Sequence, residues 1–500
     1  MIKVNFTLFR KIWFLLTQNY LTRAFTSFSS VQIIGTLVGL LVLSLYTRHL
    51  SPEDYGKITF IMIFVIIASI VIDSGLNTAF SIRFYKVSEE ENKKNIYTVL
   101  IYNFIVLLVF CSVFLLFPGL FEKLLKVKIS FHQKLLIFYL ILTSIAGRFY
   151  TNLLLISKKP KSYFIVNSYF FLAVIAMSFV FLVVWEKGYF SYIYAYAIAH
   201  SVLAIAGMFY FLTAYKPKIA GVFSKKNLIS ILKLGFPLVP NSLLLMLLTY
   251  ADRYILEKYM DLAAVGIYSV GYVFADKVST IVINPAGQAL TPVSFQTFAR
   301  SVSEYTVLLK KIFESYWLMI GIFLALYFSV LREIFELIVG TKYVEGYNII
   351  PIVIAGTIFW GAANMIGGTV VIKEKTDKVF LFSLLAVVLN IALNFLLIPA
   401  YGIYGAALAT FVSYVIYFLL FFSYTQKLVY VPYNIKLIVS SGLISLFFLI
   451  VIISISYLQI NVWCRLLGKI ICALLFILIM QKLFNVKNVI KDILQYGQQK

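Results

Sequence analysis

The chain has 500 residues, of which 62% are hydrophobic and only 13% are charged. About a quarter of the residues of a soluble globular protein are charged, so this composition excludes a soluble enzyme. It also excludes intrinsic disorder, which requires low hydrophobicity. The formal net charge is +23, from 43 Lys and Arg against 20 Asp and Glu. In a membrane protein such an excess gathers in the cytoplasmic loops, and we therefore expect no nucleic acid partner.

Apolar runs of about 20 residues, each long enough to cross a bilayer as a helix, follow one another along most of the chain. Lipid offers no hydrogen-bond partner to an open backbone, so each run is expected to be helical. Fourteen runs are predicted, over residues 29–47, 58–82, 96–117, 135–157, 162–185, 188–215, 228–251, 262–290, 312–330, 346–372, 379–398, 403–425, 437–458 and 462–483. The predicted fold class is an all-α integral membrane protein that lies in the lipid bilayer.

The loops between the runs predict an orientation. If the N-terminus is cytoplasmic, the inner segments carry 26 Lys and Arg and the outer loops carry ten. By the positive-inside rule, both termini are expected in the cytoplasm. The apolar and basic residues of segment 1–28 are typical of a short interfacial helix, and residues 485–500 are expected to form a cytoplasmic tail.

The first six runs resemble the next six. Shifted by 214 residues, Lys159 coincides with Lys373 and Gly188 with Gly402, and VFLVVWEKGYFSYIYA lies over NFLLIPAYGIYGAALA. Six is an even number, so both halves enter the membrane from the same side, as in transporters with parallel repeats. We predict an N-lobe over 29–215 and a C-lobe over 216–425 around a central cavity, with 426–484 as two added helices.

Polar residues in the predicted N-lobe follow helical spacing. Asp73 lies on a stripe with Ser69, Asn77 and Ser81, each four residues apart, which places them on one helix face. Arg148 lies near the centre of the fourth run. An ionised side chain in the membrane is costly and usually faces a cavity or a partner.

The predicted C-lobe carries a comparable stripe. Tyr272, Asp276 and Thr280 follow at steps of four, Lys277 is next to Asp276, and Asn364 lies in the tenth run. We interpret these residues as the lining of the cavity. Arg148, Lys277, Asn77, Asn364 and Tyr272 would bind substrate, and Asp73 and Asp276 would respond to a coupling cation. The alternative is structural, namely buried ion pairs and interhelical hydrogen bonds that only fix helix packing.

Prolines interrupt two of the runs. Pro237 and Pro240 lie in GFPLVPNS, and Pro285 lies in NPAG. Proline frees a carbonyl group and bends a helix, so these positions are predicted hinges.

The motifs of common enzymes are missing. The sequence has no phosphate-binding loop, zinc-protease helix, nucleophile elbow or paired cysteines, so we expect no catalytic residue, no metal and no cofactor. The acidic pair in LSPEDYG (50–56) is similar to that of metal-binding membrane glycosyltransferases. Those enzymes carry a large outer domain, which the short loops of this chain cannot form.

Several segments in order resemble one family. They are TRHLSPEDYG (47–56), DSGLNTAF (73–80), GFPLVPNSLLLMLLTYADRYIL (235–256), VGIYSVGY (265–272) and LNFLLIPAYGIYGAALAT (393–410). Together they look like the bacterial polysaccharide transporters. These are the Wzx-type O-antigen and exopolysaccharide flippases of the multidrug/oligosaccharidyl-lipid/polysaccharide exporter superfamily.

The resemblance implies a flippase of the bacterial cytoplasmic membrane. Such proteins move undecaprenyl-pyrophosphate-linked oligosaccharides, the repeat units of lipopolysaccharide O-antigen, capsule or exopolysaccharide, by alternating access that an ion gradient can drive. Polysaccharide polymerase and glycosyltransferases of the same pathway are the implied protein partners. Two alternatives stay open: a drug or metabolite antiporter of the same superfamily, and a membrane polymerase or glycosyltransferase of the pathway.

Overall fold

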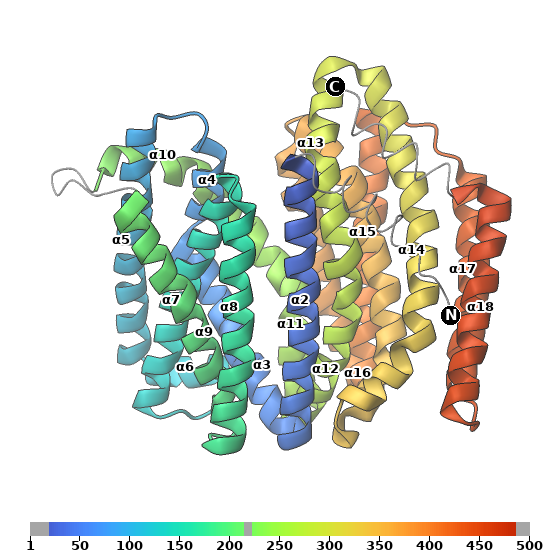
Figure 1. Cartoon of the computed structure of the whole chain (residues 1–500), viewed down its shortest axis with the longest axis horizontal. Helices are drawn as coiled ribbons and strands as arrows, with labels where there is room; N and C mark the ends of the chain where they lie inside the picture. The colour runs from blue at the N-terminus through green and yellow to red at the C-terminus, as the bar shows by residue number, and fades with distance from the viewer. Residues whose placement is uncertain (1–19, 215–222, 487–500) are drawn as a thin grey trace, which may run out of the picture. The chain divides into compact units, whose positions relative to one another are not determined.

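The computed structural model describes residues 20–214 and 223–486 of the chain. The described residues form helices and no strand, and thirteen of the helices are long and apolar enough to cross a membrane. The predicted all-α integral membrane fold is therefore confirmed (Figure 1). The chain divides into two compact units. Unit 1 comprises Met1–Tyr250 and Asp261–Gly266, and unit 2 comprises Ala251–Met260 and Ile267–Lys500.

Unit 1 is a bundle of helices, and serine side chains cap the starts of several of them. Ser51, Ser88 and Ser130 each accept a hydrogen bond from a backbone N–H in the first turn of the following helix, which satisfies a donor that the helix leaves open. The elements are α2 (Tyr20–His49), α3 (Pro52–Asp73), α4 (Leu76–Arg83), α5 (Glu89–Leu116), α6 (Pro118–Leu125), α7 (Phe131–Ile156), α8 (Pro160–Phe179), the π-helical turn η1 (Val180–Val184), α9 (Phe190–Ala214), α10 (Lys225–Gly235), the 3₁₀ turn η2 (Phe236–Leu238) and the first part of α11 (Val239–Tyr259).

Unit 2 contains the remaining helices. In it α17 and α18, the two added helices, pack against each other and against α14 (Figure 1). The elements are α12 (Leu262–Val278, which begins in unit 1), the π-helical turn η3 (Ser279–Ile283), α13 (Asn284–Arg300), α14 (Val302–Ile338), the 3₁₀ segment η4 (Thr341–Ile349), α15 (Ile350–Ile372), α16 (Thr376–Leu428), α17 (Ile435–Ser456) and α18 (Val462–Phe484).

Fourteen predicted runs correspond to thirteen long helices because the eleventh and twelfth runs both lie inside α16. Its 53 residues hold two of the predicted runs, and Gly402 between them has a non-helical backbone with φ 55° and ψ −131°. Gly188, which the repeat alignment pairs with Gly402, also has φ 55°. Glycine adopts positive φ without a steric penalty, so both repeats turn at the same aligned position.

Helix boundaries differ from the predicted runs where polar residues extend a helix. The ninth run was predicted over 312–330 and the helix spans Val302–Ile338; hydropathy marks the lipid-facing part of a helix and not its whole length. The short helix α6 was not predicted, because eight residues are too few for a run. Residues 20–28 continue α2, and residues 1–19 and 487–500 of the predicted terminal segments lie outside the described residues.

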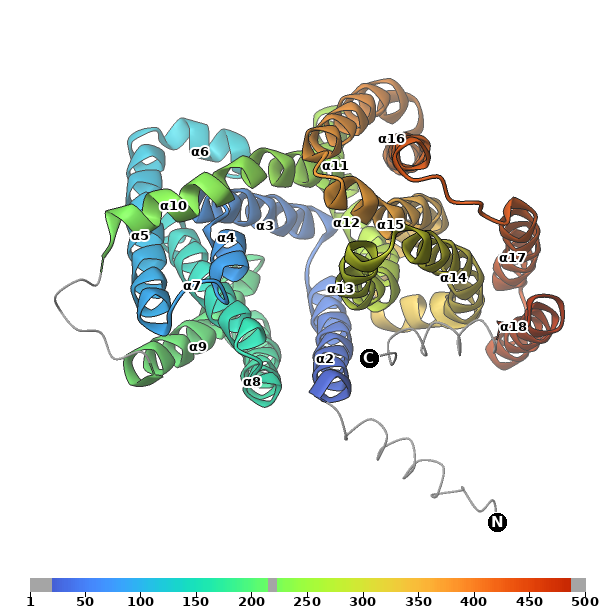
Figure 2. The same ribbon diagram turned by 90° about the horizontal axis from the view of Figure 1, so that it is seen from above.

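Loops predicted to be cytoplasmic meet at one end of unit 1. The Lys159 ammonium donates to the Tyr210 hydroxyl over 2.7 Å, and the Asn227 amide donates to Asn95 over 2.8 Å. α10 lies along α4 and α5 (Figure 2). The start of the seventh run, predicted to belong to the C-lobe, therefore packs within unit 1.

Candidate functional site

The second predicted run is broken in the middle of its polar stripe. α3 ends at Asp73, Ser74 and Gly75 adopt left-handed φ values of 50° and 73°, and α4 begins at Leu76. The expectation of one continuous helix over 58–82 was therefore wrong. At the break the backbone of Gly75 lies against that of Gly235, a contact between distant segments that the sequence alone does not reveal. A Cβ atom on Gly75 would lie 2.2 Å from the carbonyl oxygen of Gly235 at the end of α10.

The break brings a carboxylate to a helix N-terminus. The backbone N–H of Asn77, in the first turn of α4, donates to Asp73 Oδ2 over 3.3 Å. The first N–H groups of a helix have no partner within the helix and carry a partial positive charge. The Asp73 carboxylate, at the end of α3, thus takes the place that a bound anion would have at the N-terminus of α4.

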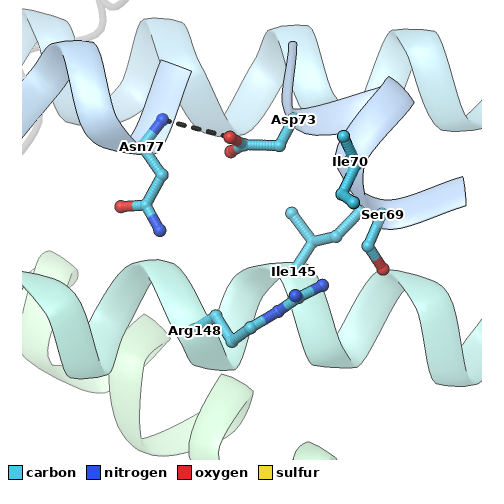
Figure 3. A pocket seen from close by; sticks show the side chains of 6 residues that line it. All are labelled: Ser69, Ile70, Asp73, Asn77, Ile145 and Arg148. Carbon is cyan, nitrogen blue, oxygen red and sulfur yellow. Dashed lines mark hydrogen bonds between the residues drawn. The ribbon is translucent and has the colours of Figure 1, made fainter. Parts of the chain in front are cut away.

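Arg148 of α7 lines a cavity together with Asp73 and Asn77. The cavity has a volume of about 110 Å³ and is lined by Ser69, Ile70, Asp73, Asn77, Ile145 and Arg148. Figure 3 shows these side chains, which come from the three helices α3, α4 and α7. The sequence predicted that Asp73, Asn77 and Arg148 are site residues, and the structure brings the three together in unit 1.

The guanidinium of Arg148 is available to a ligand. Its Nε donates to the Ser144 carbonyl one turn earlier over 3.3 Å, and the side chain is exposed on the surface of the unit. No ion pair within 4.0 Å involves Arg148 in the described part of the chain, and Asp73 acts on it only at longer range. The described residues thus contain no tight Asp73–Arg148 ion pair. Interhelical hydrogen bonds, the other form of the structural alternative, are present nearby, from Asn152 to Asn77 and Ser81.

The amide of Asn152 holds the side chain of Asn77, which lines this cavity. Asn152 Nδ2 donates to Asn77 Oδ1 over 2.6 Å and to Ser81 Oγ over 2.7 Å. Asn103 of α5 is 5% exposed, neither of its amide atoms has a hydrogen bond, and it lies beside the Asp73 carboxylate. Helical spacing predicted Asn77 and Ser81, whereas Asn103 was missed because it lies on another helix among apolar residues.

The predicted C-lobe residues lie in unit 2 on α12 and α15. Asp276 is exposed and accepts a hydrogen bond from Thr280 Oγ1 over 3.2 Å. Lys277 is half-buried beside it. Asn364 is exposed, and its amide donates to the Trp360 carbonyl over 3.0 Å. A glycine lies near the start of both the second and the eighth run, Gly56 and Gly266, 210 residues apart. Asp73 is the seventeenth residue after Gly56, whereas Asp276 is the tenth after Gly266. The two acids therefore do not occupy equivalent positions in the repeats.

Tyr272 belongs to a closed cluster that the sequence did not reveal. Its ring centroid lies 4.2 Å from the guanidinium carbon of Arg253, and the Tyr268 ring lies 4.8 Å from it. Arg253 Nη1 is 2.6 Å from Asp252 Oδ1, and the Tyr268 hydroxyl donates to Asp252 Oδ2 over 2.8 Å. The side chains of Arg253 and Asp252 are 2% and 1% exposed.

A second ionic cluster joins α14 and α18. Glu333 accepts from Arg465 Nε over 2.9 Å and pairs with Lys469, whose side chain is fully buried. Partners more than 130 residues apart give no local sequence pattern. This cluster joins α18, the second of the two added helices, to α14 within unit 2.

The predicted hinge prolines lie where helices are interrupted. Pro237 is in the 3₁₀ turn η2, Pro240 is in the first turn of α11, and Pro285 opens α13 after the π-helical turn η3. Proline is tolerated in a first turn because its missing N–H would be unpaired there.

The acidic pair of LSPEDYG is engaged within its own helix turn. Ser51 caps α3, and Lys57 pairs with Glu53 at 2.9 Å and with Asp54 at 3.2 Å. Among the described residues, no group of three or more His, Cys, Asp and Glu side chains could hold a metal ion.

Comparisons with known proteins identify a family from the sequence and a shared fold from solved structures. A family model described as polysaccharide biosynthesis protein matches residues 21–298. The solved lipid II flippase MurJ, in an inward closed conformation, is similar with a TM-score of 0.73 and 18% identity, over 92% of this chain and 99% of that one. An inward-facing multidrug resistance MATE family transporter of the MOP superfamily has a TM-score of 0.62 and 12% identity, over 78% of this chain and 94% of its own. A Vibrio cholerae MATE transporter has a TM-score of 0.56 and 17% identity, over 83% and 95%. No curated protein sequence matches significantly.

Proposed function

Since the chain belongs to the family of polysaccharide biosynthesis proteins, we propose that it is a flippase for polyprenyl-pyrophosphate-linked oligosaccharides. It moves the head group, an O-antigen, capsule or exopolysaccharide repeat unit on an undecaprenyl carrier, from the inner to the outer leaflet of the cytoplasmic membrane. The fold that it shares with the lipid II flippase and with multidrug transporters supports transport.

The observation that carries the proposal is Arg148, which lines the polar cavity of unit 1 and has no carboxylate within ion-pair distance among the described residues. A pyrophosphate and its sugars cannot enter hydrocarbon unaided, because each buried polar group without a partner costs kilocalories. A guanidinium donates in a planar fork that suits phosphate oxygens. The start of α4 adds backbone N–H groups, and interrupted membrane helices commonly direct such N-termini at anionic substrates.

The other predicted residues complete the proposal. Lys277 would be a second anion ligand, Asn364 and Tyr272 would contact the glycan, and Asp276 would respond to a coupling cation. Tyr272 is the weakest of these, because its ring already stacks on Arg253. Pro237, Pro240 and Pro285 would act as hinges of alternating access.

A multidrug antiporter is the second candidate, because the MATE fold likeness covers most of the chain. Its substrates are often cations, which an unpaired arginine repels. The unit 1 cavity therefore favours an anionic substrate. A polymerase or glycosyltransferase is disfavoured because the acidic pair Glu53 and Asp54 is held by Lys57.

The proposal includes the orientation with both termini in the cytoplasm, where the polymerase and glycosyltransferases of the pathway would be its partners. The test starts from a variant in which Cys111, Cys464 and Cys472 are replaced by serine, since Cys464 is exposed. A membrane-impermeant thiol reagent, applied to intact cells, should then label a cysteine introduced at Ala400 and not one introduced at Lys161; both positions are exposed. The reverse labelling would contradict the orientation.

The function itself is tested in lipid vesicles that contain the purified full chain. We expect a fluorescent polyprenyl-pyrophosphate oligosaccharide to change leaflets in these vesicles and not in protein-free vesicles. Arg148→Ala should lose this activity, Arg148→Lys should retain part of it, and Arg300→Ala, which removes an exposed arginine at the end of α13, should behave as the parent. An Arg148→Ala variant with full activity would remove Arg148 from the site. A parent that moves no such lipid would contradict the function.

A further inference from the structure

We propose that the Asp73 carboxylate occupies the site that the anionic group of the substrate binds, and so competes with it. One small cation, Na⁺ or a proton, must bind beside Asn103 and neutralise Asp73 before the anionic group can bind. The inference rests on the proposed function, since it concerns the same cavity. It goes beyond it by giving the sign of the coupling between cation and substrate.

The Asp73 carboxylate occupies the place where a substrate anion would bind. It accepts from the Asn77 backbone N–H, and the Gly75 N–H also lies beside it. These are the first N–H groups of α4, and N-termini of helices bind phosphate groups through such donors. The Arg148 guanidinium lines the same cavity and has no partner within ion-pair distance in the described chain.

The charges of the lining cancel while the cavity is empty. Asp73 and Arg148 are the two charged residues among the six that line it. A pyrophosphate brings at least two negative charges to a cavity of about 110 Å³ that already holds a carboxylate. Repulsion between like charges at such distances is strong wherever the effective dielectric constant is far below that of water. The anion site therefore becomes attractive only when Asp73 is neutralised.

The surroundings of Asp73 suit a small cation. Asn103 is 5% exposed and lies beside the carboxylate, and neither its amide oxygen nor its amide nitrogen has a hydrogen-bond partner among the described residues. α3 ends at Asp73, and the end of a helix carries a partial negative charge that attracts cations. Interrupted membrane helices commonly bind Na⁺ or protons at such ends.

The groups that face Asp73 come from several helices. They are Ser69 on α3, Asn77 on α4, Asn103 on α5 and Ile145 and Arg148 on α7, with His200 of α9 within electrostatic range of Arg148. Only Arg148 among them carries a fixed charge. It repels a cation in the empty cavity, and a bound pyrophosphate removes that repulsion. Cation and anion consequently strengthen each other's binding, because such coupling is reciprocal.

The test is a binding titration of radiolabelled inorganic pyrophosphate to the full chain in lipid nanodiscs. For the parent we expect the affinity to rise about tenfold, as one neutralised charge implies, when Na⁺ replaces a large organic cation or when the pH is lowered. An effect of Na⁺ at constant pH identifies sodium, and an effect of pH without Na⁺ identifies the proton. The ratio of variant to parent affinity at each pH removes the protonation of pyrophosphate itself.

Two substitutions test whether Asp73 competes with pyrophosphate or instead helps the cavity to bind it. Asp73→Asn should bind pyrophosphate at least as tightly as the cation-loaded parent, without cation dependence. Asp377→Asn, which removes an exposed carboxylate in the first turn of α16, should titrate as the parent does. Weaker binding by Asp73→Asn than by the cation-free parent would overturn the inference, and so would a parent whose affinity ignores both Na⁺ and pH. If Asp73→Asn does not fold, the cation dependence of the parent decides.

The outcome is distinguishable from a failure of the proposed function. A parent that flips the lipid-linked oligosaccharide but binds pyrophosphate without any cation effect contradicts only the inference. A parent that neither flips the lipid nor binds pyrophosphate contradicts both.

Discussion

Two regions of the molecule use the same residue types in opposite ways. In unit 1, Asp73 and Arg148 line a cavity without forming an ion pair. In unit 2, Asp252 and Arg253 touch at 2.6 Å, two tyrosine rings flank the guanidinium, and both charged side chains are almost fully buried. This pair is enclosed and its carboxylate is used within the cluster, by Arg253 and by Tyr268, so the cluster offers a ligand little to bind.

The difference teaches how to separate structure from function among intramembrane charges. The presence of an acid and an arginine near each other decides nothing. What matters is whether their donors and acceptors are already used. The closed cluster should therefore respond to substitution through the amount of folded protein, and the open cavity through binding and transport.

The largest effect is expected at Arg253. Arg253→Ala leaves Asp252 buried beside Tyr268 without its cation, and loss of one partner of a buried pair costs about 3–5 kcal/mol. Little folded protein should be recovered. Detergent-solubilised protein followed by fluorescence-detected size-exclusion chromatography gives this amount. Recovery at the level of the parent would mean that the cluster does not hold unit 2 together.

A smaller loss of stability is expected from a side chain added at Gly235, whose backbone lies against that of Gly75. A Cβ on Gly235 would lie 2.5 Å from the Gly75 carbonyl oxygen, and such overpacking costs about 1–3 kcal/mol. Gly235→Ala should lower the melting temperature and also reduce transport, because the break that presents Asp73 to α4 shifts.

Gly442 is the matched control for this substitution. It lies within α17, and a Cβ there would meet no atom within 4 Å. Alanine is a better helix former than glycine by up to about 1 kcal/mol, so Gly442→Ala should raise the melting temperature or leave it unchanged. If both variants behave alike, the contact between Gly75 and Gly235 is not what shapes the cavity.

The cluster between α14 and α18 sharpens the comparison further. Lys469→Met removes a fully buried ammonium, but Glu333 keeps its bond to Arg465 at 2.9 Å. We expect a loss of about 1.5–3 kcal/mol, since a hydrogen bond to a charged group is of this size. Thermal unfolding measures it. A loss as large as that of Arg253→Ala would show that Arg465 does not compensate.

The smallest effect is expected at Asn152. Asn152→Ala removes two hydrogen bonds that orient Asn77 and Ser81 and leaves the charges of the cavity intact. Pyrophosphate affinity should fall about fivefold, which corresponds to about 1 kcal/mol, with folded yield unchanged. Unchanged affinity would mean that Asn77 does not need this support.

Local periodicity was enough to predict much of this molecule. The helices follow from apolar runs, Asp73 and Asn77 follow from polar side chains at helical spacing, and Arg148 follows from its charge near the centre of a run. These inferences need only one helix at a time, and a residue's position on its own helix is set by the geometry of the α-helix.

What the sequence could not reveal depends on contacts between distant segments. The break at Ser74 and Gly75 is shaped by Gly235, and Arg253 looked like a helix-end residue because the apolar run stopped at Ala251, whereas α11 continues to Tyr259. A signal was present in the second case. Tyr268 and Tyr272, four residues apart on α12, form an aromatic face that suits a buried guanidinium.

The central claim is that the cavity of unit 1 receives the substrate head group. Photo-crosslinking tests it most directly, with a photoreactive amino acid placed at Ile145, an apolar lining residue, and in a second protein at Leu443, an exposed residue of α17. With a radiolabelled polyprenyl-pyrophosphate oligosaccharide, we predict saturable crosslinking at position 145 that an excess of inorganic pyrophosphate suppresses, and only unsaturable labelling at position 443. Equal, unsuppressed labelling at the two positions would contradict the claim.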